Sequence, residues 1–263
     1  MVLETGTLST FLYDGLIERG VAIECICARH AKGVLSARVN KSDVHDAEGL
    51  AQLARTGWYK RVHMKASATH IDRAARRIRA QLITARTSMA NQLRGLLKLF
   101  GLRMGTARTP GRRAQRLTVF YAQRPDLKAL FDPLIASMEA IEEQLRASNR
   151  LLNERAKADV VCTRLMSVPG VGPITALTDT STIEDPHCFA RSEDVGAYAG
   201  LVPRRSHFGE RDISGHISKA GDPMLRRALY EAANVALLQV KRPLPLQQWG
   251  RKMAEAKGAK RAR

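Results

Sequence analysis

Aromatic residues are scarce in this 263-residue chain, at 5%, and Asp and Glu are outnumbered by Lys and Arg, 25 against 43. No apolar run approaches the ~20 residues of a membrane-spanning helix, which excludes such a segment. The first residues show no basic start followed by an apolar run, so we do not expect a secreted protein. The four cysteines show neither CxxC spacing nor a disulfide framework, which indicates a reduced, cytoplasmic protein.

The net charge of +18 is concentrated in two parts of the chain. Residues 60–124 carry 16 basic residues and one acidic residue, Asp72, while residues 241–263 carry 8 basic residues and one acidic residue. Each Lys or Arg placed on a phosphate releases condensed counterions, so this distribution favours a nucleic-acid partner. The alternative is a merely solvated, soluble surface.

The predicted elements indicate an α/β part at residues 1–65, all-α parts at residues 66–157 and 158–240, and a basic tail at residues 241–263. In the first part, Leu8, Leu12 and Leu16 share one face of a short helix that ends at Gly20. A largely apolar strand is predicted at residues 21–27, and a helix at residues 43–56 ended by Gly57. These elements are a fragment of an α/β domain.

Two long helices are predicted next, because apolar residues recur every three or four positions. The first run comprises Ile71, Ala75, Ile78, Leu82, Ala85, Met89, Leu93, Leu96 and Phe100. Off this seam lie Arg73, Arg76, Arg77, Arg79, Arg86 and Arg94. The second run comprises Leu127, Phe131, Leu134, Met138, Ile141, Leu145, Ser148 and Leu152. The two helices form either an antiparallel hairpin or a coiled coil with another subunit.

The part at residues 158–240 is predicted to be helical with glycine-marked turns. We expect the basic tail at 241–263 to be disordered unless nucleic acid or missing sequence orders it. Its most specific motif is VPGVGPITA at residues 168–176. A turn through Gly170 and Gly172, followed by Pro173 at a helix start, exposes backbone amides to an anion. This is the physics of a helix-hairpin-helix phosphate clamp; the alternative is a tight structural turn.

Three carboxylates are candidate metal ligands. Asp43 and Asp46 share a face at the start of one helix, and Glu4 lies just before another. Carboxylates that converge from separate elements can hold Mg²⁺ for phosphodiester chemistry. Taken alone, acidic residues at a helix start more often favour the helix dipole.

A block at residues 196–234 is dense in Gly, Ser, His, Arg and Lys, and we read it as a loop that leads into a helix. Its candidate nucleophiles are Ser206, Ser214 and Ser218, although a loop serine is usually a turn former. Its candidate phosphate contacts are Arg204, Arg205, Arg211, Lys219 and Arg226. His207 and His216 have no ligand-like spacing and are interpreted as polar loop residues.

Several long motifs in order resemble the bridge-RNA-guided DEDD transposases, insertion-sequence recombinases related to the Piv DNA invertase. The motifs are LETG (3–6), ARHAKGVLSARVNKSDVHDAEGLAQLARTGW (28–58), VPGVGPITA (168–176), AYAGLVPR (197–204) and ISKAGDPMLRRALYEAAN (217–234). The resemblance implies a RuvC-like (RNase H-like) domain, a coiled-coil linker and a C-terminal transposase domain with an active-site serine. It implies that Glu4, Asp43 and Asp46 hold Mg²⁺, and that the chain recombines DNA as a dimer or tetramer with a guide RNA.

The chain departs from this family's pattern in three places. The family's first catalytic Asp would precede Glu4, and family chains usually continue past the basic tail, so we expect a chain truncated at both ends. The family serine belongs to a Ser-Gly pair that here reads Phe208-Gly209, with Ser206 as the nearest hydroxyl. We therefore expect nucleic-acid binding with weak or no catalysis. The alternatives are a catalytically silent binding protein that oligomerises with full-length relatives, and a structure-selective nuclease.

Overall fold

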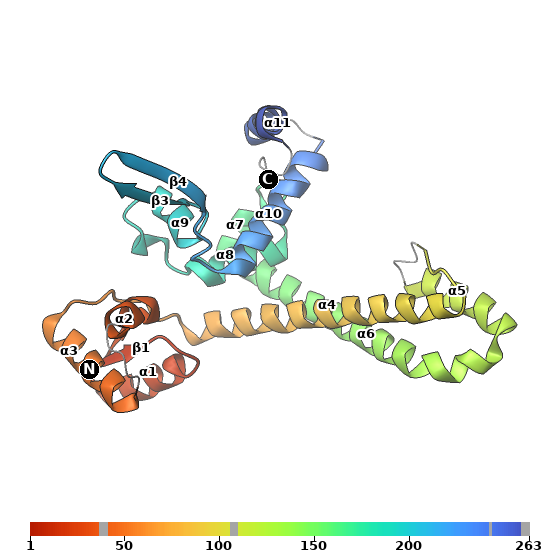
Figure 1. Cartoon of the computed structure of the whole chain (residues 1–263), viewed down its shortest axis with the longest axis horizontal. Helices are drawn as coiled ribbons and strands as arrows, with labels where there is room; N and C mark the ends of the chain where they lie inside the picture. Colours follow the sequence, from red (N-terminus) through yellow and green to blue (C-terminus); the bar gives the residue numbers. More distant parts are fainter. Residues whose placement is uncertain (37–41, 106–109, 242–243, 259–263) are drawn as a thin grey trace. The chain divides into compact units, whose positions relative to one another are not determined.

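A computed structural model describes residues 1–36, 42–105, 110–241 and 244–258. The chain divides into two compact units (Figure 1). The first unit comprises Met1–His70 with Asp185–Cys188, and the second comprises Ile71–Glu184 with Phe189–Arg263. The fold is mostly helical with two small sheets. The expected division into four domains stays a prediction.

The first unit is built on two short parallel strands, β1 (Val2–Glu4) and β2 (Glu24–Ile26). Its helices are α1 (Ser9–Ile17), α2 (Ala28–Leu35) and α3 (Asp43–Thr56). Ile26, Ala31 and Leu53 form its small buried core. The backbone of residues 60–62 extends the pairing on β2, since the Val62 amide donates to the Cys25 carbonyl over 2.8 Å.

The boundaries of α3 match the prediction because both of its ends are encoded locally. Ser42 accepts a hydrogen bond from the His45 amide (3.2 Å), which caps the first turn. Gly57 ends the helix with φ of +68°, a conformation that glycine adopts readily. Asn40 and Lys41, also predicted as helix-start residues, lie outside the described residues.

Two predictions for this unit are wrong in detail. The strand expected over residues 21–27 is only three residues long. The helix expected to end at Gly20 ends at Ile17, and on its predicted leucine face Leu8 and Leu12 are 65% and 40% exposed. With two strands, this sheet offers too little apolar surface to cover the whole helix face.

The second unit is organised by α4 (Ser67–Leu99) and α6 (Lys128–Ala158), which run antiparallel. Near one end of the pair Asp72 forms an ion pair with Arg155, and further along the Arg79 Nε donates to the Asn149 Oδ1 over 2.6 Å. At the other end, residues of both helices meet in one buried cluster. These contacts confirm the antiparallel hairpin within the chain; a coiled coil with another subunit stays a prediction.

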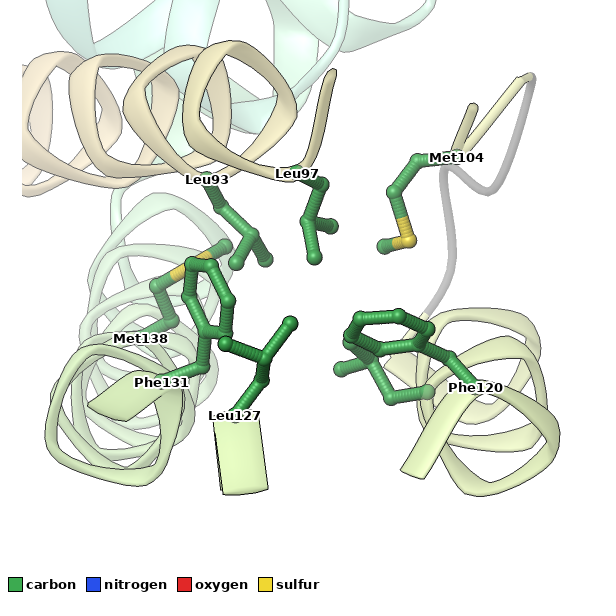
Figure 2. Packing of buried hydrophobic residues seen from close by; sticks show 8 residues of the cluster. Leu93, Leu97, Met104, Phe120, Leu127, Phe131 and Met138 are labelled. Carbon is green, nitrogen blue, oxygen red and sulfur yellow. The ribbon is translucent and has the colours of Figure 1, made fainter. Parts of the chain in front are cut away.

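That cluster is completed by a helix the sequence analysis missed (Figure 2). α5 (Pro110–Gln123) and the short η1 (Pro125–Leu127) lie between the two long helices in sequence. Figure 2 shows side chains from α4, α5, η1 and α6 converging on one another. The buried members of the cluster are Leu93, Leu97, Met104, Leu117, Phe120, Leu127, Phe131 and Met138.

The predicted seam of α4 is wrong at Ile71 and Ile78 in its first half. Ile71 and Ile78 are 55% and 60% exposed, whereas Arg76, expected off the seam, is only 2% exposed. A straight α-helix rotates by about 20° per heptad relative to a strict seven-residue repeat, so the buried face moves along a long helix. Ala75 accordingly packs on a different cluster, around Leu152 of α6.

The C-terminal part of the second unit contains five helices and a β-hairpin among the described residues. The helices are α7 (Val160–Met166), α8 (Pro173–Ile183), α9 (Ser192–Tyr198), α10 (Pro223–Leu238) and α11 (Pro245–Lys257), while η2 (Pro186–Cys188) belongs to the first unit. β3 (Pro203–Phe208) and β4 (Arg211–Ile217) pair antiparallel.

Two predictions for this part are corrected. The block interpreted as a loop contains the β3–β4 hairpin, because a tight turn at Gly209 lets its two polar halves pair with each other. The tail expected to be disordered contains α11. Pro245 begins this helix, and the buried Gln247 anchors it by donating to the Ala236 and Val240 carbonyls over 3.1 and 2.9 Å.

We predict that the buried ion pair between α5 and α6 is a strong stability determinant. The Arg113 Nη2 lies 3.0 Å from the Glu142 Oε1, and both side chains are 9% exposed. Glu142→Ala leaves a buried guanidinium without its partner, and we expect a loss of about 3–5 kcal/mol in the free energy of unfolding. Urea unfolding followed by circular dichroism measures this loss.

Asp126→Ala is the matched control, because it breaks the exposed pair with Arg124, whose side chain is 47% exposed. Solvent screens that pair, so the control should unfold close to wild type. Equal unfolding midpoints for the two variants would contradict the prediction.

Candidate nucleic-acid interface

The turn between α7 and α8 gives its two glycines different roles. Gly170 has φ of +97°, and a Cβ there would lie 2.6 Å from the Ala232 carbonyl oxygen of α10. Gly170 is therefore required for the close approach of α10. Gly172 is the N-cap of α8, with φ of −97° and no atom within 4 Å of an added Cβ. Space and helix geometry at Gly172 suit an anion on the α8 amides.

Two of the predicted phosphate contacts, Arg226 and Lys219, form hydrogen bonds to backbone carbonyls instead. The Arg226 Nη1 donates to the Ala199 and Gly221 carbonyls over 3.0 and 2.7 Å. Lys219 has φ of +54°, and its amide donates to the Gly200 carbonyl over 3.0 Å. Arg226 thus fastens the two chain segments at the base of the β3–β4 hairpin, and its side chain is half-buried by doing so.

The hairpin itself carries two further predicted contacts. Arg204 Nη2 lies 3.3 Å from the Ser218 carbonyl oxygen, to which it donates. Arg205 forms a two-bond ion pair with Asp212 across the strands, with distances of 2.7 and 2.5 Å. This hydrogen bonding raises the pKa of Arg205 and lowers the pKa of the Asp212 carboxyl. Both side chains stay exposed, so a phosphate could exchange with Asp212.

Ser206, the candidate nucleophile, lies on the exposed surface of β3 opposite Ile213. Because directly paired residues share a face of an antiparallel ladder, Ser206 lies on the same face as Phe208 and Arg211. No His, Asp or Glu is paired with it in this register, so the hairpin supplies no general base beside its hydroxyl. Ser206 belongs to the second unit, whereas Glu4, Asp43 and Asp46 belong to the first.

The three carboxylates lie on neighbouring elements of the first unit. Glu4 ends β1 and is half-buried, while Asp43 and Asp46 occupy the first turn of α3, which packs beside β1. Among the residues that the structure describes, no three His, Cys, Asp or Glu side chains come together in a way that could hold a metal ion. In this structure Glu4, Asp43 and Asp46 are therefore not gathered into one three-ligand group.

α4 carries seven basic residues and a single acidic residue, Asp72, which is paired with Arg155. The exposed basic residues of α4 are Arg77, Arg86, Arg94 and Lys98. At a rise of about 1.5 Å per residue, they extend over roughly 30 Å of helix. The helix therefore carries little negative charge that would compete with a polyanion for these cations.

The sequence does not reveal one buried charge, Arg76, and one half-buried charge, Asp179. Arg76 is buried near Asp222, and burial lowers the pKa of its guanidinium. Its Nε and Nη1 have no hydrogen-bond partner among the described residues. Burial also raises the pKa of the Asp179 carboxyl on α8. No sequence signal distinguishes Arg76 from the exposed arginines around it, because its burial depends on the packing of α4 against distant segments.

Two family models match the chain. One, described as "Transposase IS116/IS110/IS902 family", matches residues 162–248, and the other, DEDD_Tnp_IS110, described as "Transposase", matches residues 1–101. The chain is 31% identical over 268 residues to the "Transposase for insertion sequence element IS1111A" of Coxiella burnetii, across 100% of this chain and 72% of that protein. The chain belongs to the IS110/IS116/IS902 family of transposases.

Two further transposases are similar to this chain at the same level. A "Probable family 20 transposase" of Pseudomonas aeruginosa is 30% identical over 84% of this chain and 66% of its own length. The "Transposase for insertion sequence element IS1328" of Yersinia enterocolitica is 30% identical over 74% of this chain and 59% of its own length. The chain thus spans about six to seven tenths of these transposases.

The family matches confirm the resemblance to DEDD insertion-sequence transposases and place it on the fold. The match to residues 1–101 covers the described strands and helices of the first unit up to residue 70, together with α4. The match to residues 162–248 covers the α7–α8 turn, the β3–β4 hairpin and α10. None of the described helices of this transposase-family chain is long and apolar enough to cross a membrane.

We predict that the two glycines of the α7–α8 turn respond differently to alanine. Gly170→Ala should cost roughly 1–3 kcal/mol in the free energy of unfolding, because the methyl group meets the α10 backbone at a left-handed position. Gly172→Ala, the control two residues away, should change stability by only about 0.5 kcal/mol. Thermal unfolding of both variants tests this, and comparable losses would refute the assigned packing role.

Proposed function

We propose that this chain binds DNA through the basic surface of α4 as part of the transposition of an insertion sequence in the cytoplasm. The observation that carries the proposal is the charge of α4, whose only acidic side chain is engaged by Arg155. Cations spread along one rigid helix can follow successive phosphates without reading bases. Such binding is strong at low salt and weakens steeply as salt rises.

The α7–α8 turn and the β3–β4 hairpin supply further proposed contacts. Gly172 supports a phosphate at the α8 amides, because the N-terminus of a helix favours an anion. Arg204, Arg205 and Lys219 are proposed to contact the sugar–phosphate backbone, and Arg226 to position them. The resemblance to guided transposases extends the proposal to a guide RNA and to a dimer or tetramer.

We propose that transposases of this family cleave and transfer DNA strands with the help of Mg²⁺. In this chain, Glu4, Asp43 and Asp46 of a RuvC-like domain would be the ligands of that ion. Mg²⁺ would polarise the phosphodiester and activate a nucleophile. The three carboxylates form no three-residue metal group among the described residues, and Phe208 occupies the place expected for serine. We therefore propose weak or no cleavage by this chain.

The Phe208 position also favours a second candidate, a catalytically silent nucleic-acid-binding protein that associates with full-length relatives. Leu134 packs against the cluster of Figure 2 and Leu145 is 5% exposed, so both residues of α6 are engaged within the chain. We propose that such an association uses another surface. Co-purification with a full-length relative distinguishes this candidate from a chain that acts alone.

We predict that removing charge from α4 reduces the salt dependence of DNA binding. Arg77→Ala with Arg86→Ala removes two exposed cations, and the slope of log K against log salt should fall by about 2 for duplex DNA. Fluorescence anisotropy with a labelled duplex at several salt concentrations measures the slope.

The matched control is Arg146→Ala with Arg150→Ala on α6. These arginines are also exposed, but Glu143 and Glu154 lie on the same helix within one turn. The control should leave the slope nearly unchanged. An equal decrease in both double variants would assign the effect to total charge and contradict a role for α4.

We predict that the purified chain shows no Mg²⁺-dependent strand cleavage above the level of an Asp43→Ala variant. The physical reason is the incomplete carboxylate group, because catalytic groups that act as a unit lose most of their rate together. Gel analysis of a labelled junction or supercoiled plasmid measures cleavage. Cleavage by the wild-type chain that Asp43→Ala abolishes would overturn the proposed inactivity and establish Asp43 as a catalytic residue.

A further inference from the structure

We infer that the tip of the β3–β4 hairpin stacks Phe208 on an unpaired base of single-stranded DNA. The inference rests on the proposed DNA binding and adds the form of DNA and the residue that recognises it. The first observation is the exposure of the hairpin. Every residue of β3 and β4 is exposed, although an isolated pair of strands is only marginally stable in water.

The hairpin is held firmly at its base, which makes it a positioned element rather than a loose loop. The Ser218 amide donates to the Val202 carbonyl over 2.8 Å, just beyond the last strand pair. Gly200, with φ of +71°, lets the two segments approach, because a Cβ there would lie 2.6 Å from the Ala220 nitrogen. Arg226 then ties both segments to α10.

The tip presents an aromatic ring to solvent. Phe208 is 86% exposed, the largest value among the exposed large hydrophobic side chains of the described residues. It is paired with Arg211, and Gly209 (φ of +56°) forms the tight turn between them. An aromatic ring fixed at a strand end keeps its face accessible, which is what stacking on a base requires.

The charge around the ring selects nucleic acid over a second copy of the chain. Arg211 lies directly beside Phe208, Arg204 lies further along β3, and Lys219 follows β4. Residues 203–219 carry four basic residues against two acidic ones, Glu210 and Asp212. A second copy would therefore bring two net-positive hairpins together, whereas a DNA strand supplies phosphates beside each base. A base inside a duplex is already stacked on its neighbours, so the free ring face favours an unpaired base.

The test compares binding of the full chain to two probes, a fluorescein-labelled 20-nucleotide oligo-dT and a 20-base-pair duplex, by anisotropy. Phe208→Ala should weaken oligo-dT binding by about 5- to 150-fold, the loss of one base–aromatic stack. Duplex binding should change by less than about threefold. Phe208→Trp should retain oligo-dT binding, and DNA should quench the added tryptophan fluorescence.

Phe11→Ala is the matched control, because Phe11 is 77% exposed on α1 and lies outside the hairpin. If Phe208→Ala binds oligo-dT as Phe11→Ala does, or loses affinity equally for both probes, the inference is wrong while DNA binding stands. If the wild-type chain binds neither probe, the proposed function fails as well. Loss of a dimer in sedimentation with unchanged DNA affinity would assign Phe208 to self-association and overturn the inference.

Discussion

The second unit depends on the antiparallel packing of α4 against α6. The cluster around Phe131 joins one end of the pair, and the Asp72–Arg155 ion pair joins the other. α6 then leads into the core that holds α7 and α8, and the turn between these helices seats α10 through Gly170. α10 in turn carries Arg226, which fixes the base of the β3–β4 hairpin. Each proposed DNA contact in the C-terminal part therefore depends on the contacts that precede it.

The elements that could be predicted from the sequence are those whose ends and faces are encoded locally. Ser42 and Gly57 define α3, and apolar spacing defines the length of α4. The burial of Arg76 and the presence of α11 could not be predicted, because both depend on residues far away in sequence. Gln247, for example, has the sequence character of a surface residue, and only the fold shows that it donates to the Ala236 carbonyl. The β3–β4 hairpin was missed because its strands have no apolar alternation.

The candidate site, too, could be predicted from the sequence only in part. Motif order identified the family, and the family matches confirm it. The sequence could not separate residues that would contact DNA from residues that hold the backbone, since both are basic or glycine. Gly170 and Gly172 are two positions apart, yet only Gly170 is confined by α10. The carboxylates could be named from the motifs, but whether they converge depends on strand length and helix placement in three dimensions.

The exposure of both hairpin strands has a consequence for how this protein can change over generations. No side chain of β3 or β4 contributes to a buried core, and the fastening of the hairpin lies at Gly200, Gly221 and Arg226. Substitutions at the tip are therefore nearly neutral for folding. A different side chain at the tip therefore alters recognition without disturbing the scaffold that presents it.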